Sequence, residues 1–371
     1  MNVYSYYVEV FLTMYEAIII GAGQAGISIG YYLKKTSKKF LILDKNSEIG
    51  ESWKERYDSL VLFTPRMYSS LPGMEMEGDK HGFPNKNEIA LYLKKYVQKY
   101  ELPIKLDTEV TNVSKKSNYY QVGTNKEEFL TKNLIIATGP FQTPNIPTFS
   151  KKISDKIFQI HSSEYKNPSQ LADGNVLVVG GGNSGAQIAV ELSKQRKTFL
   201  SHSKNFKFLP LIFNKKSIFW WFDRFGILKA NHSSLIGKII QKKGDPIFGY
   251  ELKHEIKKNN VVLKERAIDV QDDKIIFNDF SALTFNNIIW ATGFKYQLPW
   301  LNIQELYDKD GKLIHDRGKT SIDGLYFIGL PWQYRRGSAL LQGVGYDAEY
   351  IVNNLMSNKN AKNRDIFNLY S

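Results

Sequence analysis

Short apolar runs, each followed by a glycine-rich turn and a helical pattern, recur along this chain. Residues 15–20 (YEAIII) end at the turn GAGQAG, and a helical pattern then extends to about residue 35, before the apolar run 40–43 (FLIL). The same order returns after residue 175, where NVLVV leads into GGGNSG, a helical pattern and the apolar run 198–201 (TFLS). Short apolar runs that alternate with helical patterns predict strands in parallel βαβ units.

These two units divide the chain into similar parts. Their glycine turns begin at Gly21 and Gly180, and in each part a later apolar run ends in Ala-Thr-Gly, at residues 137–139 and 291–293. Between residues 105 and 128, alternation of apolar and polar positions predicts an antiparallel meander. The sequence therefore predicts an α/β fold with two Rossmann-like dinucleotide-binding domains.

The first glycine turn carries the spacing GxGxxG, with glycines at positions 21, 23 and 26. In such a turn the first glycine permits the tight bend, and the second lets the backbone approach a pyrophosphate at the helix N-terminus. The third lets helix and strand pack closely. Asp44 ends the next predicted strand, where a carboxylate accepts hydrogen bonds from ribose hydroxyls. We therefore expect FAD, with its unphosphorylated ribose, at this turn.

The second turn, residues 180–185, repeats the spacing without the acid. The position that matches the acid is Ser203, between His202 and Lys204. A carboxylate there would repel a ribose 2′-phosphate, whereas hydroxyl and ammonium groups hold one. This difference predicts NADPH at the second turn. The alternative is that Lys204 and Lys207 are solvated surface charges.

Composition narrows the chemistry. The chain has 371 residues and no cysteine, which excludes disulfides, thiolate metal sites and a redox dithiol and fits a cytoplasmic protein. Its six histidines are scattered, so we expect no metal site. The net charge of +13 comes with no nucleic-acid-binding motif, and we attribute it to a lysine-rich composition rather than to a polyanionic partner. No apolar run reaches the roughly 20 residues that span a bilayer.

Two segments stand apart from the repeated pattern. Residues 1–13 lack the basic start of a signal peptide, and we interpret them as an extension ahead of a normal start at Met14. Residues 206–258 are rich in Lys, Phe and Trp. They are interpreted as a lid over an apolar substrate, as a peripheral membrane contact or as a helical insertion with a buried aromatic stripe.

Several motifs give the chain a wider resemblance, which extends from about residue 14 to residue 354. In these motifs the sequence resembles the class B flavin-dependent monooxygenases, in the branch of small bacterial flavoproteins and plant YUCCA-type enzymes. Besides the first glycine turn, the matching stretches are residues 57–65 (YDSLVLFTP), 68–73 (YSSLPG), 137–139 (ATG), 161–165 (HSSEY), 180–192 (GGGNSGAQIAVEL), 291–294 (ATGF) and 324–345.

Two stretches depart from that family's pattern. The family fingerprint FxGxxxHxxx followed by Phe or Tyr keeps His161 and Tyr165, but Asp155 and Ile157 replace its Phe and Gly. The family's GGxW is GESW here, at residues 50–53. We expect both changes to bear on oxygenation rather than on the fold.

The resemblance implies a domain order in which an NADPH domain is inserted into an FAD domain. The expected boundaries are residues 1–13 for the extension, 14–160 and 291–371 for the two parts of the FAD domain, and 161–290 for the NADPH domain. The expected cofactor-binding residues are Gly21, Gly23, Gln24, Ala25, Gly26, Asp44, Lys45, Trp53, Thr64, Val110, Ala137, Thr138, Gly139, Gly180, Gly182, Asn183, Ser184, Gly185, His202, Ser203, Lys204, Ala291, Thr292, Gly293, Gly329 and Gly345. Trp332, Tyr334 and Arg336 are the expected active-site residues, with plain packing as the alternative for the aromatic rings.

Three functions remain open at this point. The first is a monooxygenase in which NADPH reduces FAD, dioxygen adds at the flavin C4a as a (hydro)peroxide, and a small organic substrate is oxygenated. The second is a reductase that passes electrons to a quinone or protein without a thiol relay. The third is a flavin-binding sensor, against which the two nearly intact nucleotide motifs argue. The sequence does not identify the substrate or the oligomeric state.

Overall fold

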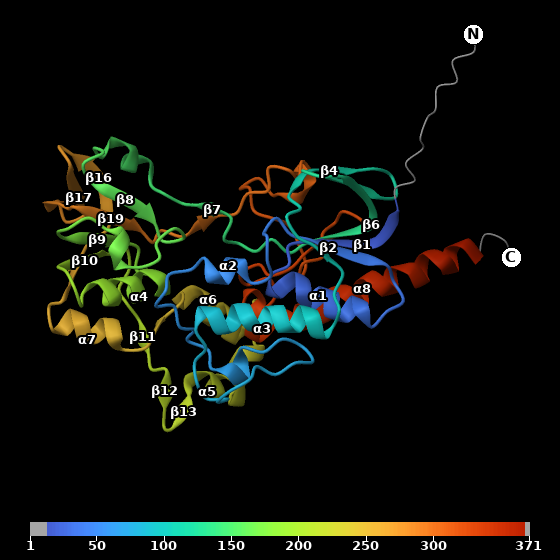
Figure 1. Ribbon diagram of the computed structural model, residues 1–371. Coiled ribbons are helices and arrows are strands. Elements are labelled where there is room, and N and C mark those ends of the chain that lie inside the picture. The colour runs from blue at the N-terminus through green and yellow to red at the C-terminus, as the bar shows by residue number, and fades with distance from the viewer. Residues whose placement is uncertain (1–12, 368–371) are drawn as a thin grey trace, which may run out of the picture.

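The chain folds around two sheets, one mixed and one wholly parallel, that lie side by side (Figure 1). The structure is a computed structural model and describes residues 13–367, so the expected extension lies almost wholly outside the described residues. We call the part around the first sheet the first body and the part around the second sheet the second body. The predicted α/β class with two Rossmann-like parts is confirmed.

The first sheet has the order β3-β2-β1-β6-β5-β4, and β21 pairs with the last residues of β6, beyond those that pair with β5. Strands β3, β2, β1, β6 and β21 pair in parallel, whereas β4, β5 and β6 form the predicted antiparallel meander. The strands are β1 (Met14–Ile20), β2 (Phe40–Leu43), β3 (Ile104–Lys105), β4 (Val110–Lys115), β5 (Tyr120–Thr124), β6 (Glu128–Ile136) and β21 (Leu325–Phe327).

Alternate residues of the central strand β1 enter two different cores. Ala17 and Ile19 pack under helices α1 (Gln24–Lys34), α3 (Lys86–Lys99) and α8 (Leu341–Phe367). Ile18 and Ile20 pack on the other face, with the meander and the loop around Leu298 and Leu301. Burial on both faces explains why this strand is a continuous apolar run and not an alternating one.

The second sheet has the order β15-β10-β9-β19-β8, and all of its pairs are parallel. Helices α4 and α7 pack on one face and a small antiparallel sheet, β16-β17-β18, packs on the other. The elements are β8 (Phe158–His161), β9 (Val176–Val179), α4 (Asn183–Leu192), β10 (Thr198–Ser201), α7 (Glu251–Lys257), β15 (Val261–Lys264), β16 (Ala267–Gln271), β17 (Lys274–Phe277), β18 (Ala282–Thr284) and β19 (Asn287–Trp290).

In sequence the second sheet interrupts the first, because β8 to β19 lie between β6 and β21. The two connections between the bodies pair with each other as antiparallel strands, β7 (Thr143–Pro144) and β20 (Phe294–Lys295). Figure 1 shows β7 between the two bodies. The chain therefore leaves and re-enters the first body through one two-stranded connection.

The lysine- and aromatic-rich segment folds as short mixed elements rather than as a helical insertion with a buried aromatic stripe. Of its six Phe and Trp residues from Phe213 to Phe225, Phe219 is the buried one. The elements are β11 (Phe208–Leu209), β12 (Ile212–Phe213), β13 (Lys216–Ser217), α5 (Ile218–Arg224), α6 (Leu235–Lys243) and β14 (Ile247–Phe248).

The remaining elements are short. They are α2 (Glu51–Lys54) and the 3-10 helices η1 (Arg66–Tyr68), η2 (Thr148–Lys152), η3 (Pro168–Gln170), η4 (Ile227–Lys229), η5 (Gln304–Leu306) and η6 (Arg336–Ala339). Among residues 13–367, no helix combines the length and the apolar character that crossing a bilayer requires. The same residues hold no group of three or more His, Cys, Asp or Glu side chains that is arranged for a metal.

Candidate functional site

The first glycine turn joins β1 to α1, and each of its glycines has a different reason to lack a side chain. Gly21 has φ +107°, and a Cβ there would lie 2.6 Å from the carbonyl oxygen of Ala137. A Cβ on Gly26 would lie 1.8 Å from the carbonyl oxygen of Gly21. A Cβ on Gly23 would meet nothing within 4 Å, so the turn is open above this residue, at the start of α1.

Asp44 follows β2 and lies against this turn. Its Oδ2 accepts a hydrogen bond from the backbone N–H of Ala22 at 2.5 Å, and its Oδ1 accepts one from Asn46 at 2.8 Å. Burial raises the pKa of Asp44, and the two backbone donors oppose that rise. Each carboxylate oxygen keeps a second lone pair, so Asp44 can still accept from a ligand hydroxyl.

The second turn, between β9 and α4, repeats this geometry. Gly180 has φ +122°, and its Cβ would lie 2.2 Å from the carbonyl oxygen of Ala291. A Cβ on Gly185 would lie 2.0 Å from the carbonyl oxygen of Gly180, and one on Gly182 would meet nothing within 4 Å. The repeated Ala-Thr-Gly therefore has a structural reason, since its alanine carbonyl packs against the first glycine of each turn.

The basic group expected at the second turn lies at the end of β10. Ser203 and Lys204 are exposed, while the His202 ring packs on Phe206 at 4.8 Å between ring centres. His202 Nδ1 lies 3.1 Å from the carbonyl oxygen of Lys204. The Lys204 ammonium has no ion pair within the described part of the chain.

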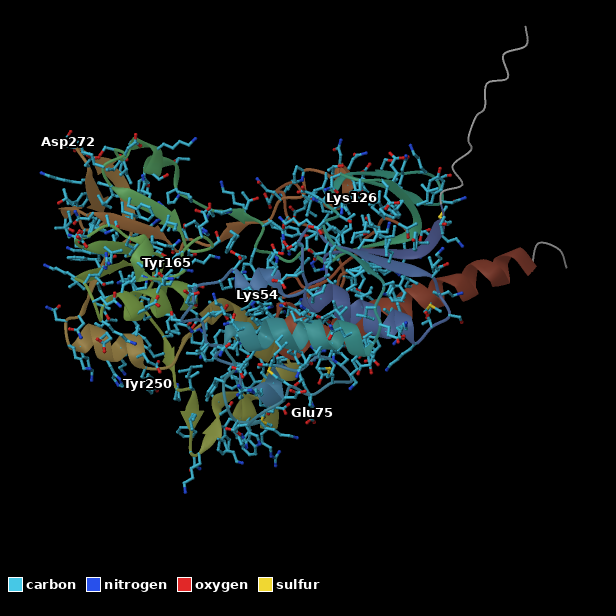
Figure 2. The ribbon with its side chains drawn as sticks, viewed as in Figure 1. Lys54, Glu75, Lys126, Tyr165, Tyr250 and Asp272 are labelled. Carbon is cyan, nitrogen blue, oxygen red and sulfur yellow. The ribbon has the colours of Figure 1, made fainter. Side chains whose placement is uncertain are left out.

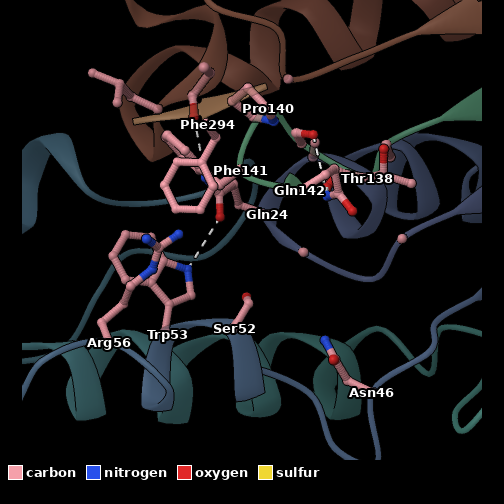
Figure 3. A pocket seen from close by; sticks show the side chains of 18 of the residues that line it. Gln24, Asn46, Ser52, Trp53, Arg56, Thr138, Pro140, Phe141, Gln142 and Phe294 are labelled. Atoms are coloured by element: carbon pink, nitrogen blue, oxygen red, sulfur yellow. Dashed lines mark hydrogen bonds between the residues drawn. The ribbon is translucent and has the colours of Figure 1, made fainter. Parts of the chain in front are cut away.

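One cavity of about 510 Å³ extends from the first glycine turn to the start of α4. Figure 3 shows part of its lining, around Gln24, Trp53 and Phe141. The expected cofactor-binding residues that line it are Gly21, Gly23, Gln24, Ala25, Asp44, Lys45, Trp53, Thr64, Val110, Ala137, Thr138, Gly139, Asn183, Ser184 and Gly329. Those that do not line it are Gly26, Gly180, Gly182, Gly185, His202, Ser203, Lys204, Ala291, Thr292, Gly293 and Gly345.

The wall of this cavity near the first turn is fixed by side-chain hydrogen bonds. Trp53 Nε1 donates to Gln24 Oε1 at 3.3 Å, and Gln24 Nε2 donates to the carbonyl oxygen of Ala339 at 3.2 Å. Figure 3 shows the Trp53 indole directed at Gln24.

Gly50 is the glycine that GESW keeps from the family's GGxW. It has φ +85°, and a Cβ there would lie 2.8 Å from the Cα of Ala90.

Arg56 is a cavity residue that the sequence reasoning missed. Its guanidinium carbon lies 5.1 Å from the ring centre of Phe141 and 5.9 Å from that of Phe294 (Figure 3). Burial lowers the pKa of this guanidinium, and its side chain forms no ion pair within residues 13–367. A cation that lies beside two aromatic rings and has no acidic partner can bind an anion that enters the cavity. The signal for it was its place directly before the recognised stretch 57–65.

A tyrosine and a glutamine connect the two bodies across the cavity. Tyr57 Oη donates to Gln187 Oε1 at 2.8 Å, and Gln187 Nε2 donates to the carbonyl oxygen of Val61 at 3.3 Å. Gln187 belongs to α4, the helix that begins at the second glycine turn. These bonds hold that helix beside the segment that follows Trp53.

Of the two fingerprint residues, His161 contacts the connection between the bodies and Tyr165 lies within the second body. His161 Nε2 lies 3.0 Å from the carbonyl oxygen of Gly293, and its Nδ1 lies 2.7 Å from Ser163 Oγ. Burial lowers the pKa of His161, so the ring is neutral at neutral pH. Tyr165, which Figure 2 shows within the second body, is buried and donates to Glu191 Oε2 at 2.8 Å.

The departure at Ile157 also has a structural account. Its side chain is buried in the core of the second body, with Leu177, Val179 and Phe199. The larger residue therefore fills a core position instead of leaving a flexible glycine there.

The three expected active-site residues do not line the cavity. Trp332 has φ +56°, Tyr334 lies under the Arg317 guanidinium at 4.2 Å, and Arg336 pairs with Asp245 at 2.8 Å. Their catalytic role stays a prediction without geometric support. Gly345 has a packing reason, because a Cβ there would lie 2.5 Å from Cγ of Pro72.

Comparison with known proteins places this geometry in a family. Residues 18–207 match the pyridine nucleotide-disulphide oxidoreductase family model. An uncharacterized oxidoreductase CzcO from Bacillus subtilis is 66% identical over 339 residues, which are 91% of this chain and 98% of that protein. The probable indole-3-pyruvate monooxygenase YUCCA1 of Arabidopsis thaliana is 29% identical over 92% of this chain and 89% of its own. A flavin-containing monooxygenase from Stenotrophomonas maltophilia superposes with a TM-score of 0.79 and 25% identity, over 93% of this chain and 99% of that one.

The family name refers to a disulphide, but this chain has no cysteine that could relay electrons. Its YUCCA relatives are probable indole-3-pyruvate monooxygenases, and its neighbours from Stenotrophomonas maltophilia are flavin monooxygenases, whereas bacillithiol disulfide reductases share the fold at lower identity. The chain therefore belongs to the pyridine nucleotide-disulphide oxidoreductase family as a flavin-dependent NAD(P)H oxidoreductase, and its monooxygenase relatives and neighbours support the resemblance to the class B flavin monooxygenases.

Proposed function

We propose that this protein is an FAD-containing, NADPH-dependent monooxygenase that acts on a small organic substrate. The observation that carries the proposal is the single cavity lined both by the first glycine turn and by the first residues of α4. A hydride donor bound at the start of α4 and a hydride acceptor bound at the first turn would both have access to this cavity. The absence of cysteine agrees with direct transfer between the two cofactors.

FAD fits the first turn. The open space above Gly23 lies at the start of α1, where backbone N–H groups favour a pyrophosphate. Asp44 offers acceptors for ribose hydroxyls, and Trp53 and Gln24 form a fixed wall. When bound, FAD would supply an acceptor for the hydride of the nicotinamide and, once reduced, a centre for the activation of dioxygen.

NADPH fits the second turn for the same reason that FAD fits the first, which is open space at the start of a helix. The space above Gly182 is open, and Asn183 Nδ2 and Oδ1 are fixed to the carbonyl oxygen of Pro246 and the N–H of Phe248. Ser203 and Lys204 lie at the end of the adjacent strand, with no acid at their position. We assign the 2′-phosphate to this group, and we propose residues 161–290 as the NADPH domain, between parts 14–160 and 291–371 of the FAD domain.

The part of the cavity lined by Phe141, Phe294 and Arg56 is the proposed substrate site. Phe141 and Phe294 pack edge to face at 5.3 Å between ring centres, and Arg56 lies beside both. Apolar rings exclude water from the reacting atoms, and the guanidinium orients an anionic group of the substrate or of the coenzyme.

The experiment follows the reoxidation of reduced enzyme. Purified protein is reduced by one equivalent of NADPH without oxygen and then mixed with aerated buffer in a stopped-flow spectrometer. We expect a transient absorbance, distinct from reduced and oxidised flavin, and less peroxide released when a thioether, amine, ketone or 2-oxo acid is oxygenated. Direct reoxidation with stoichiometric peroxide, whatever substrate is offered, would favour the reductase that uses a quinone or protein acceptor.

A further inference from the structure

A small aromatic unit projects from the lower edge of the molecule. It consists of the β12–β13 hairpin and α5 (Figure 1). Three of its apolar side chains face solvent: Ile212 is 58% exposed, Phe213 58% and Phe225 66%. In Figure 2 the side chains of this hairpin extend beyond the rest of the molecule. Exposed apolar groups this close together mark an interaction site more often than chance exposure does.

The exposed rings belong to one ordered cluster. Phe213 and Phe225 each lie against Trp221, at 6.1 Å and 5.9 Å between ring centres, and Trp220 lies 4.8 Å from Trp221. Trp221 Nε1 donates to the carbonyl oxygen of Phe213 at 3.0 Å, which ties α5 to the hairpin. We call Ile212, Phe213, Trp220, Trp221 and Phe225 the aromatic tip.

The segment that carries this tip is strongly basic. Residues 206–243 contain one acid, Asp223, and the basic residues Lys207, Lys215, Lys216, Arg224, Lys229, Lys238, Lys242 and Lys243. Lys215 lies in the turn of the hairpin, and Lys216 begins β13, with its Nζ 5.8 Å from the Trp220 ring centre. The Tyr68 hydroxyl donates a hydrogen bond to Asp223 Oδ2 at 3.3 Å. In the described part of the chain none of the cations at the tip forms an ion pair.

We propose that the aromatic tip docks the protein on the surface of an anionic lipid bilayer. Phe and Ile enter the boundary of the acyl chains, Trp rings prefer the headgroup level, and lysines pair with anionic headgroups. A protein partner would have to supply both an apolar pocket and acidic groups around it, whereas an anionic bilayer supplies both everywhere on its surface.

The tip is fixed to the rest of the protein through the opposite side of α5. Phe219 is buried and lies 6.0 Å from Phe63, a cavity residue, and 5.2 Å from Phe248. Docking therefore needs no refolding of this unit, and it brings one wall of the cavity toward the lipid.

The test is co-sedimentation of the flavin-loaded, full-length protein with vesicles. One set contains phosphatidylglycerol and phosphatidylcholine in equal parts, and the other contains phosphatidylcholine alone. We expect binding to the anionic vesicles that falls steeply with salt, and little binding to the neutral ones. Replacement of Phe213 and Phe225 by Ser lowers the partition coefficient by more than about tenfold. Replacement of Lys215 and Lys216 by Gln lowers it by roughly fivefold for each lysine.

Matched controls lie on other parts of the surface. Phe280 is 87% exposed beside β17, and Phe280→Ser leaves binding unchanged. Replacement of the exposed Lys116 and Lys126 by Gln is the matched control for the lysine variants, and it leaves binding unchanged. Flavin content and NADPH oxidation in solution show that each variant is folded. The proposal is overturned if the unmodified protein does not bind anionic vesicles, or if the variant with Phe213 and Phe225 replaced binds them as before. It is also overturned if these substitutions dissociate a dimer of this chain.

Discussion

At the scale of single residues, some glycines of the two turns are required for backbone packing, and others leave open space for a ligand. A Cβ on Gly26 meets the backbone of Gly21 at 1.8 Å, whereas a side chain on Gly23 enters open space. Gly26→Ala is therefore expected to lower the yield of folded protein. Gly23→Val is expected to give folded protein without flavin, because the side chain occupies the place of the pyrophosphate. Flavin absorbance and thermal unfolding of the two variants measure this, and full flavin content in Gly23→Val would contradict the assignment.

The preference for NADPH depends on the group after β10. A charge-assisted hydrogen bond to a 2′-phosphate contributes about 1.5–3 kcal/mol, which corresponds to roughly ten- to a hundredfold in binding. His202→Ala combined with Lys204→Ala is expected to raise KM for NADPH by that factor and to leave KM for NADH nearly unchanged. Lys207→Ala is the matched control, since Lys207 Nζ already donates to the carbonyl oxygen of Lys243 at 2.8 Å. Equal use of both coenzymes by the unmodified enzyme contradicts this assignment.

His161 gives a pH dependence of stability with a definite sign. Burial places its folded-state pKa below the ordinary value of about 6.5, so the unfolded chain binds the proton more readily. Its contribution is present above pH of about 6.5 and is lost as the pH falls through the folded-state pKa. His161→Gln is expected to flatten the loss of Tm between neutral and mildly acidic pH. Part of the slope remains, because burial also lowers the pKa of His315. Parallel Tm curves for the two proteins would refute this role.

At the scale of elements, the sequence predicted those whose pattern is local. The strands β1, β2, β9 and β10 and the two glycine turns follow from apolar runs and GxGxxG spacing, both properties of neighbouring residues. The two-residue strands of residues 206–248 have no such pattern. They are defined by their partners, as when Phe208 of β11 pairs with Ile247 of β14. Strand pairing of that kind depends on tertiary contacts and cannot be predicted from local periodicity.

The core position of Ile157 gives a prediction at this scale. Ile157→Gly restores the family residue but removes a buried side chain from the core around Leu177 and Phe199. We expect a loss of about 3–5 kcal/mol in the free energy of unfolding, measured with denaturant. Ile157→Val, as the conservative control, costs about 1 kcal/mol. An Ile157→Gly protein as stable as the parent would show that the side chain is not packed as described.

At the scale of the whole molecule, the sequence predicted the two glycine turns but not how the bodies that carry them contact each other. Tyr57 and Gln187 are distant in sequence, and their hydrogen bond between the bodies is visible only in three dimensions. Arg56 was missed for the same reason, because its neighbours Phe141 and Phe294 come from the paired connections. Trp332, Tyr334 and Arg336 were chosen from their place between two motifs, which does not determine where a side chain points.

The central claim is that the two turns serve one cavity, with hydride crossing from the second to the first. Gly182→Val tests it most directly, because the side chain enters the open space of the second turn and leaves the first untouched. Anaerobic stopped-flow mixing with NADPH measures the bleaching of flavin absorbance. We predict that Gly182→Val retains its FAD and is still reduced by dithionite, but loses reduction by NADPH by a factor of a hundred or more at subsaturating coenzyme. Reduction at the rate of the unmodified protein would contradict the account.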